Sequence, residues 1–183
     1  MKTDQFTTRK PLGLEKGKVM LVPYNKNWPA LYRAERKLLK AKLGKLAVAI
    51  AHVGSTAVPG LSAKPILDIM LAVRSLNKAE KNSARFKRCG YRVKPRKEDP
   101  VTGRIFCSKD TDGLRSIHLH VTEVNSRFWK DHLRFRDLLR KDPKTARAYA
   151  RLKFRLAKRF PHDRTAYIEG KAKFILKVLC KSF

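Results

Sequence analysis

The length and composition of the chain fit one folded domain, because 183 residues with a hydrophobic share of 43% can bury a sizeable core. No apolar run approaches the roughly 20 residues of a membrane span, and the N-terminal stretch lacks a continuous apolar signal region, so we expect a cytoplasmic protein without a membrane span. The 3 cysteines are far apart and form no CxxC pair, which argues against zinc or redox chemistry and favours reduced thiols.

The charge balance is the outlying feature of the composition. The chain has 44 Lys and Arg residues against 15 Asp and Glu residues, which gives a formal net charge of +29 at pH 7. Such a field attracts polyanions, so RNA and other nucleic acids, nucleotides, phosphorylated metabolites and anionic membrane surfaces are candidate partners. Because the basic residues recur along the whole chain between apolar positions, the alternative is a solvated surface that only aids solubility.

The first half of the chain predicts strands and helices on both sides of a Gly/Pro loop. Residues 1–17 are polar and basic, and we expect a partly ordered lead-in there. A helix from about residue 28 would have Pro29 in its first turn and would end at Gly44. The other elements expected in this half are strands over 19–24, 46–53, 66–73 and 91–95, the loop over 54–65, and a helix over about 76–88.

The second half begins with a hairpin and continues as helices. Residues 103–110 and 114–123 flank an Asp-Gly pair, which is a strong signal for a tight turn between two strands. The C-terminal subregion 126–183 is helical in pattern, and Asp142 and Asp163 stand where helix N-caps belong. Its helices are expected over about 126–141, 143–160 and 164–181. The sequence therefore predicts a single α+β domain (1–183) with a mixed β-sheet in the first two thirds and helices in the last third.

The second buried strand, over 66–73, carries a carboxylate at Asp68. Alternation puts Asp68 and Met70 on one face of this strand and places its leucines on the other face. Because an unpaired buried carboxylate costs several kcal/mol, Asp68 should meet a cation, a metal ion or hydrogen-bond donors. The preceding Gly54 and Ser55 offer backbone N–H groups and a hydroxyl in a tight bend, which suits phosphate oxygens, and Lys64 adds charge. The residues alone favour a triphosphate site next to a metal-binding carboxylate, and the alternative is a Gly-Pro turn with Asp68 paired to an arginine.

Two histidines alternate on the second strand of the hairpin. His118 and His120 share one face of it, so they could form a metal site together with Asp68. Alternatively they bind phosphate, stack on a base, or are only part of a polar sheet face. Glu123 is the nearby candidate for a further acid, but strict alternation puts it on the opposite face.

Each of the expected C-terminal helices places a cation on or beside its apolar stripe. These cations are Arg136 in the first helix, Lys153 in the second, and Arg164 and Lys171 in the third, where Tyr167 stands beside them. Because unpaired buried cations are costly, they should converge on anions such as the phosphates of a nucleotide. The alternative is that their aliphatic stems pack inside while their charged ends reach water.

Several motifs together resemble the GrpB family, whose members belong to the nucleotidyltransferase superfamily with a DNA polymerase β-like core. The motifs are HVGSTAVPGLSAKPILDIML at 52–71, HLHV at 118–121, FRDLLR at 135–140, and the array of Arg164, Tyr167 and Lys171. The resemblance runs from about Val19 to Val178. It implies a Gly-Ser pair followed by an Asp and, two residues later, a second acid, which together hold two Mg²⁺ ions on a triphosphate. This chain departs from that pattern, because Met70 occupies the position of the second acid and a thioether is a poor ligand for a hard cation.

The resemblance implies a protein that binds a nucleoside triphosphate with Mg²⁺ on Asp68 and transfers a nucleotidyl group to an unknown acceptor. One alternative is a non-catalytic nucleotide or RNA binder that has lost the second acid. Another is a phosphohydrolase that uses Asp68, His118 and His120 with a transition metal. The residues expected to bind the nucleotide are Gly54, Ser55, Thr56, Lys64, His118, His120, Arg136, Lys153, Arg164, Tyr167 and Lys171.

Overall fold

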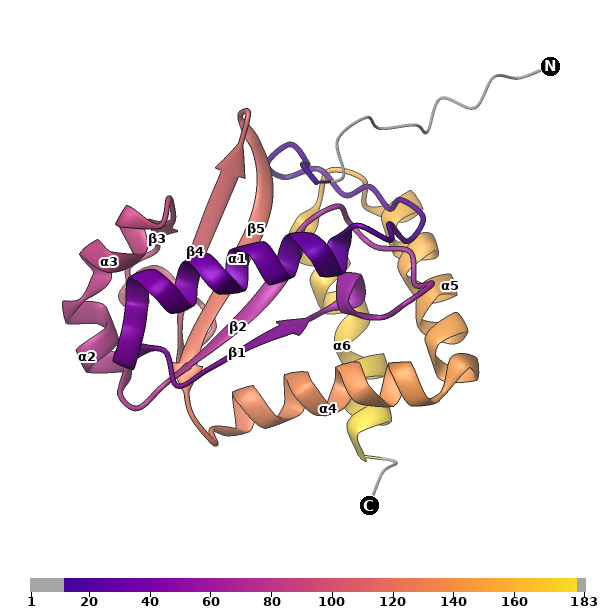
Figure 1. The fold of residues 1–183 in the computed structure, drawn as a ribbon. Helices are drawn as coiled ribbons and strands as arrows, with labels where there is room; N and C mark the ends of the chain where they lie inside the picture. Colours follow the sequence, from indigo (N-terminus) through magenta and orange to yellow (C-terminus); the bar gives the residue numbers. More distant parts are fainter. Residues whose placement is uncertain (1–11, 181–183) are drawn as a thin grey trace.

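A five-stranded mixed sheet organises the computed structural model, which describes residues 12–180 (Figure 1). Its strands are β1 (Ala49–Val53), β2 (Leu67–Val73), β3 (Arg92–Val93), β4 (Arg104–Thr111) and β5 (Leu114–Glu123). They lie in the order β1-β2-β5-β4-β3, and the central pair β2 and β5 is parallel whereas the other neighbours are antiparallel. The central strands therefore lie side by side although the β3–β4 region separates them in the chain.

Helices cover the sheet in two groups. The first group contains α1 (Trp28–Leu43), α2 (Leu76–Lys81) and α3 (Ser83–Arg88), and the second contains α4 (Arg127–Lys141), α5 (Pro143–Arg159) and α6 (Arg164–Cys180). The second group gathers at one side of the molecule (Figure 1) and packs on itself through residues such as Leu139, Tyr149 and Phe174. The expected α+β class, with a mixed sheet and a helical C-terminal third, is confirmed. No helix of residues 12–180 is long and apolar enough to cross a membrane.

The local signals for turns and caps are borne out. Asp112 and Gly113 both have positive φ, 51° and 75°, as a two-residue turn between β4 and β5 requires. Asp142 accepts hydrogen bonds from the first backbone N–H groups of α5, and Asp163 accepts one from Ala166 N at 2.9 Å. Ser126 caps α4 in the same way, since its hydroxyl accepts from Trp129 N.

Three sequence expectations are wrong in their detail. Residues 19–24 do not form a strand, because Val22 makes only an isolated bridge to Ala63 and Pro23 has no N–H to extend the pairing. The helix expected over 76–88 is broken at Asn82, whose side-chain amide donates to the Lys78 carbonyl and ends α2. The strand expected over 46–53 starts only at Ala49, because residues 44–46 form a 3₁₀ turn.

The lead-in expected over 1–17 lies partly outside the described residues, since residues 1–11 are not among them. Its remaining part packs on the sheet. Leu14 is buried and bridges Arg115 of β5, and Gly13 N donates to the Pro65 carbonyl at 2.9 Å. This segment therefore adds a bridge to the β4–β5 hairpin close to the strand that carries the histidines.

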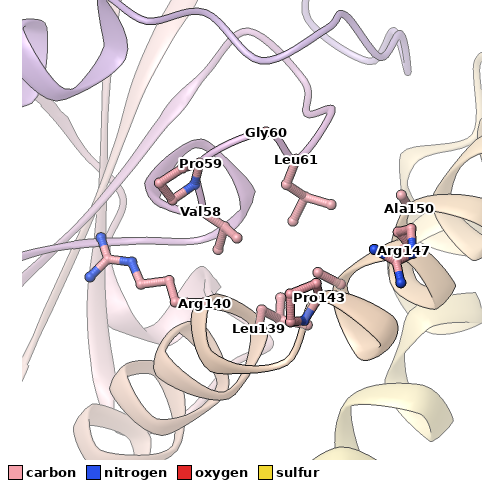
Figure 2. A pocket seen from close by; sticks show the side chains of 10 residues that line it. Val58, Pro59, Gly60, Leu61, Leu139, Arg140, Pro143, Arg147 and Ala150 are labelled. Carbon is pink, nitrogen blue, oxygen red and sulfur yellow. The ribbon is translucent and has the colours of Figure 1, made fainter.

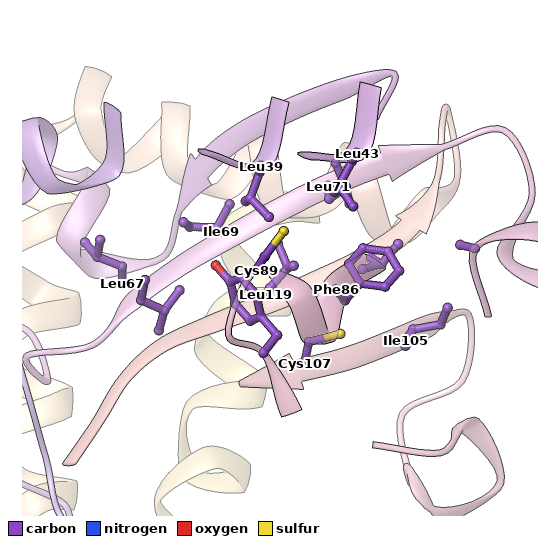
Figure 3. Packing of buried hydrophobic residues seen from close by; sticks show 14 of the residues in the cluster. Leu39, Leu43, Leu67, Ile69, Leu71, Phe86, Cys89, Ile105, Cys107 and Leu119 are labelled. Carbon is purple, nitrogen blue, oxygen red and sulfur yellow. The ribbon is translucent and has the colours of Figure 1, made fainter. Parts of the chain in front are cut away.

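The main core lies between the sheet and the first group of helices. Leu67, Ile69 and Leu71 of β2 are fully buried there against Leu39 and Leu43 of α1 (Figure 3). Burial of a leucine or isoleucine side chain stabilises the fold by about 2 kcal/mol, so this face supplies much of the stability. The thiols of two of the cysteines are free and buried in the same layer.

Candidate functional site

The sheet face opposite the main core carries the polar residues of the site. In the register of the parallel central strands, Asp68 lies beside His118 and Met70 beside His120. On the far side of β5, Phe106 of β4 lies beside His120. Because side chains alternate along each strand, these residues share one face, and Leu67, Ile69 and Leu71 of β2 lie on the other. The alternation expected for Asp68 is therefore confirmed.

The Gly-Ser bend lies directly on the Asp68 carboxylate. A Cβ atom added to Gly54 would lie 2.5 Å from Asp68 Oδ2, and Gly54 has a φ of +68°. Both facts restrict this position to glycine, since a side chain would collide with the carboxylate and strain the backbone. The chain after β1 therefore approaches the carboxylate as closely as a backbone can, and Ser55 follows at the start of the 3₁₀ turn Ser55–Ala57.

Asp68 is hydrogen-bonded but still reaches solvent. His118 Nδ1 donates to Asp68 Oδ1 at 3.0 Å, and the side chain of Asp68 keeps 34% of its exposure. Burial opposes ionisation of this carboxyl, but the hydrogen bonds and charges of His118 and His120 outweigh it and hold the pKa of Asp68 well below its usual range. Within residues 12–180, the basic side chains within 4.0 Å of the Asp68 carboxylate are these two imidazoles and not an arginine.

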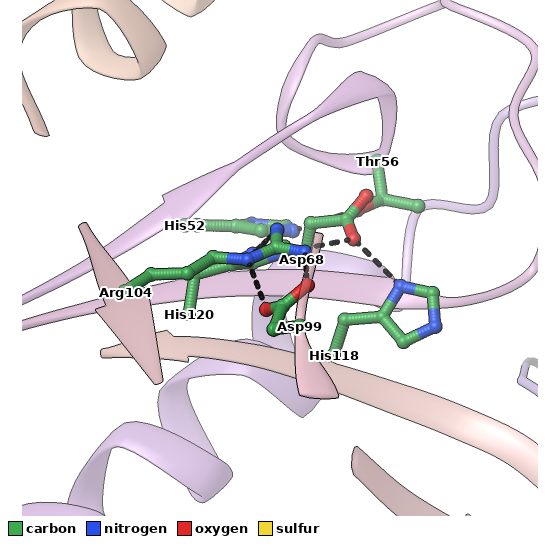
Figure 4. Close-up of polar contacts among 7 residues, drawn as sticks. All are labelled: His52, Thr56, Asp68, Asp99, Arg104, His118 and His120. Carbon is green, nitrogen blue, oxygen red and sulfur yellow. Dashed lines mark hydrogen bonds and ion pairs between the residues drawn. The ribbon is translucent and has the colours of Figure 1, made fainter. Parts of the chain in front are cut away.

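Hydrogen bonds from Asp99 through Arg104 fix the tautomer of His120 (Figure 4). Arg104 Nη1 lies 2.9 Å from His120 Nδ1, and the same guanidinium binds both carboxylate oxygens of Asp99. Because arginine can only donate, His120 Nδ1 accepts and the proton of the neutral ring is on Nε2. That Nε2–H faces Asp68 Oδ1 at 3.8 Å. Burial lowers the pKa of His120, against the attraction of Asp68, so the ring is neutral around pH 7.

Asp68, His118 and His120 together could hold a metal ion, since one ligand atom from each lies within 4.8 Å of the others. The donor set of one carboxylate and two imidazoles suits a transition metal. However, the tautomer that Arg104 imposes puts a hydrogen rather than a lone pair on His120 Nε2. In this arrangement both histidines direct an N–H group toward Asp68. The nitrogens that face the carboxylate therefore offer no lone pair to a metal ion that Asp68 would share.

The position of the second acid is apolar in space as well as in sequence. The Met70 side chain is fully buried and lies beside His120 in the register. Glu123, the other acid near the strand end, accepts a hydrogen bond from Leu76 N at 3.1 Å and so caps α2. Neither residue brings a carboxylate oxygen to Asp68.

A buried lysine from α5 lies on the other side of the Gly-Ser bend. Lys153 is 2% exposed, and its Nζ donates to Ser55 Oγ at 2.9 Å and to the carbonyl of Ser62. Burial, together with repulsion from Lys171, lowers the pKa of Lys153 to about 7. Among the described residues no carboxylate forms an ion pair with Lys153 or Lys171.

Further cations from α6 and the Gly/Pro loop surround Tyr167. The Tyr167 ring is 1% exposed, with Lys171 Nζ 4.4 Å and Lys64 Nζ 5.6 Å from its centroid. Burial and repulsion from Lys64 and Arg164 lower the pKa of Lys171 to about 8, against the attraction of Asp68. Arg164 is the exposed first residue of α6. Asp68 interacts electrostatically with Lys64, Arg164, Tyr167 and Lys171.

Two other predicted site residues have partners of their own. Arg136 donates to both carboxylate oxygens of Asp137 and to the backbone carbonyl of His52. Thr56 is buried, and its Oγ1 lies 2.9 Å from His52 Nε2. Both side chains therefore support the end of β1 and the bend that follows it, and in this structure they hold the Gly-Ser segment in place.

The sequence analysis missed Arg104, Asp99 and His132. The alternation of β4 could have placed Arg104 on the histidine face, but nothing in the sequence indicates that Asp99 of the preceding loop holds it. His132 of α4 donates from Nδ1 to the Phe128 carbonyl at 2.8 Å, and its ring lies 6.2 Å from that of His120. Helical spacing could have placed His132 on the apolar side of α4, but nothing in the sequence indicates its contact with His120 of the sheet.

A separate cavity of about 440 Å³ lies between the Gly/Pro loop and the junction of α4 with α5 (Figure 2). Its walls are mostly apolar, and Arg140 and Arg147 supply its charges. None of the residues proposed for nucleotide binding lines it. Arg140 donates to the Ala57 carbonyl, so this cavity and the site share the Gly/Pro loop as a wall and a support.

The fold and the site define an α+β protein in which a sheet carboxylate, a Gly-Ser bend and buried lysines meet. The family model described as GrpB protein matches residues 18–181, and the chain belongs to this family. It is 38% identical over 172 residues to the glutamate-rich protein GrpB of Alkalihalophilus pseudofirmus, covering 92% of this chain and 98% of that one.

Solved structures are similar as well. The crystal structure of the conserved protein GrpB from Enterococcus faecalis matches with a TM-score of 0.79 and 31% identity, over 88% of this chain and 96% of that one. The Cid1 poly(U) polymerase bound to Mg 3′-dATP matches with a TM-score of 0.43 and 14% identity, over 82% of this chain and 49% of that one.

Proposed function

We propose that the chain binds a nucleoside triphosphate with a divalent cation and transfers its nucleotidyl group to an acceptor whose identity is open. The observation that carries the proposal is the contact between the Gly54 backbone and the Asp68 carboxylate, where an added Cβ would lie 2.5 Å from Oδ2. In such a bend the backbone N–H groups would bind phosphate next to a solvent-reaching carboxylate that would hold a cation.

The lysines supply the charge that a triphosphate requires. Lys153 and Lys171 are held below their usual pKa by burial and by repulsion from neighbouring cations, so the protonated form of both is stabilised when an anion enters. Lys153 Nζ already bonds Ser55 Oγ, which links the α5 lysine to the bend. A bound triphosphate would stabilise the protonated form of both lysines, and its binding should therefore weaken as pH rises above about 7 to 8.

The residues present fit one magnesium ion and not two. Magnesium is commonly held by one or two carboxylates together with water and substrate phosphates, and Asp68 with a triphosphate meets that requirement. Met70 supplies no oxygen for a second ion. A magnesium ion held by Asp68 would neutralise phosphate charge during attack on the α-phosphate.

The residues of the chain then divide the remaining tasks. The Gly54–Ser55 bend and the lysines would hold the triphosphate and stabilise the departing pyrophosphate. His118 is neutral around pH 7, because burial lowers its pKa against the attraction of Asp68. With Nδ1 donating to Asp68, its Nε2 is free to accept the proton of an acceptor hydroxyl.

A second candidate function is nucleotide binding without transfer. The observation that favours it is the buried thioether of Met70 in the place of the second acid. In that case the Gly54–Ser55 bend and the lysines bind the nucleotide, and the cation contributes less to the affinity.

Thermal unfolding with nucleoside triphosphates, with and without Mg²⁺, tests the proposal. A triphosphate at about 100 times its dissociation constant stabilises by about 2.7 kcal/mol, which raises the Tm of a domain of this size by roughly 8 °C. Asp68→Asn should remove the magnesium-dependent part of this shift, whereas Asp131→Asn, which changes a partly exposed carboxylate on α4 that pairs with Arg127, should retain it. A shift that is independent of magnesium and of Asp68 would favour the second candidate, and the absence of any shift would contradict both.

A further inference from the structure

Helix α5 has two differently charged faces. Its inward side carries Lys153 against Ser55, and its apolar residues pack on α4 and α6. Its outward side carries a line of exposed cations spaced by three or four residues, which we name the α5 basic stripe. The stripe consists of Lys144, Arg147, Arg151, Arg155 and Lys158.

The stripe lacks the compensation found on other helices. The segment PKTARAYARLKFRLAKR contains no Asp or Glu, and among the described residues no ion pair involves a member of the stripe. By contrast, Arg127 and Arg136 of α4 pair with acids of the same helix. From Lys144 to Lys158 the stripe extends for about 21 Å at the rise of an α-helix, which is long enough to follow several phosphates of one strand.

An aromatic side chain lies beside the stripe. Phe154 is 50% exposed, although the other aromatic side chains among residues 12–180 are mostly packed. On the helical wheel it flanks Arg147 and Arg151, at an angle of about 60° from the middle of the stripe. An exposed ring next to a row of cations is the combination that proteins use for unpaired bases and their phosphates.

We propose that the α5 basic stripe binds the phosphate backbone of a single-stranded nucleic acid, with Phe154 stacking on a base. This inference does not depend on nucleotidyl transfer, because it uses the outward side of α5 and not the Asp68 site. A membrane surface fits less well, since a membrane-bound helix inserts an apolar face and the apolar face of α5 is already packed on its neighbours.

Fluorescence anisotropy with a labelled RNA of roughly 16 nucleotides at several salt concentrations tests the proposal. The variant R147Q/R151Q/R155Q removes charges of the stripe, and K78Q/K81Q/K87Q removes the same number from exposed positions on α2 and α3. We expect the stripe variant to bind at least tenfold more weakly at low salt, with the slope of log K against log salt reduced by about 2. The α2–α3 variant should keep most of the affinity.

Phe154→Ala should weaken binding of the single strand about tenfold and leave a duplex of the same sequence almost unaffected. Asp68→Asn should bind RNA like the wild type, so that failure of this inference and failure of the proposed function are distinguishable. Equal losses in the two triple variants would overturn the proposal, because they would assign binding to net charge alone. Lack of RNA binding combined with stripe-dependent binding to vesicles of anionic lipid would overturn it as well.

Discussion

The two faces of strand β2 differ in burial and in charge. Leu67, Ile69 and Leu71 are fully buried against α1 and its neighbours, whereas Asp68 points to the side of the C-terminal helices and keeps 34% of its side-chain exposure. One face gains stability from apolar burial, and the other presents to solvent an ionised carboxylate that His118 and His120 hold in place. The comparison teaches that stability and binding should respond to different substitutions within a single strand.

The largest expected effect is on the apolar face. Leu71→Ala should lower the free energy of unfolding by about 3 kcal/mol, because it leaves a cavity between β2 and α1. Urea unfolding measures it as a lower midpoint at an unchanged slope. Asp68→Asn, on the polar face of the same strand, should change the midpoint far less. Similar losses for both variants would contradict the division of the strand into a stabilising and a binding face.

The next largest effect concerns the contact between Gly54 and Asp68 on the polar face. Gly54→Ala should displace Asp68 and cost about 2 kcal/mol, and it should abolish magnesium-dependent nucleotide binding. Gly60→Ala is the matched control, since Gly60 has a φ of +76° but open space where its Cβ would be. Both variants strain the backbone, but only Gly54→Ala also collides with Asp68. Only Gly54→Ala should therefore lose nucleotide binding in a calorimetric titration. Loss of binding in both would assign the effect to the loop backbone and not to the carboxylate.

A smaller effect concerns the buried lysine and depends on pH. The pKa of Lys153 is about 7 in the folded protein and 10.5 in its ordinary state, so the unfolded chain holds this proton more tightly between those values. The cost of burying the charge is full below about pH 7 and shrinks as pH rises, which makes stability increase with pH by on the order of 1 kcal/mol per unit. Lys153→Met should flatten this rise, and Lys158→Met, at an exposed position of the same helix, should preserve it. Unfolding midpoints from about pH 7 to 10 would measure the slopes, and equal slopes would refute a buried charge at Lys153.

The smallest effect concerns the proton of one imidazole. Nitrogen chemical shifts of His120 should indicate the tautomer with the proton on Nε2, because Arg104 donates to Nδ1. Arg104→Gln should remove the constraint that arginine imposes and produce a mixture of tautomers. A wild-type ring that is protonated on Nδ1 would show that the arginine does not control His120.

Much of this arrangement could be predicted from the sequence, and the reason is periodicity. The alternation of β2 and β5 placed Asp68, His118 and His120 on one face, and the Asp-Gly pair located the hairpin. Helical spacing put Lys153 on the inward side of α5, where the structure has it. These signals are local, and each repeats over several residues of one element.

The remainder depends on contacts between distant segments that no local pattern encodes. Asp99 lies in a loop, and only the folded chain brings it to Arg104 and so to His120. Helical spacing likewise could not show that Arg136 binds its own neighbour Asp137 and the His52 carbonyl. The break at Asn82 arises from a side-chain hydrogen bond that competes with the helix, against an otherwise helical pattern.

The most direct test of the polar face is a crystal structure with a non-hydrolysable nucleoside triphosphate and Mg²⁺. The account predicts phosphate oxygens against the Gly54–Ser55 backbone, within hydrogen-bond distance of Lys153 or Lys171, and a metal ion on Asp68. A triphosphate that leaves the Asp68 carboxylate untouched, and binds instead in the cavity beside Arg140 or along the outside of α5, would contradict it.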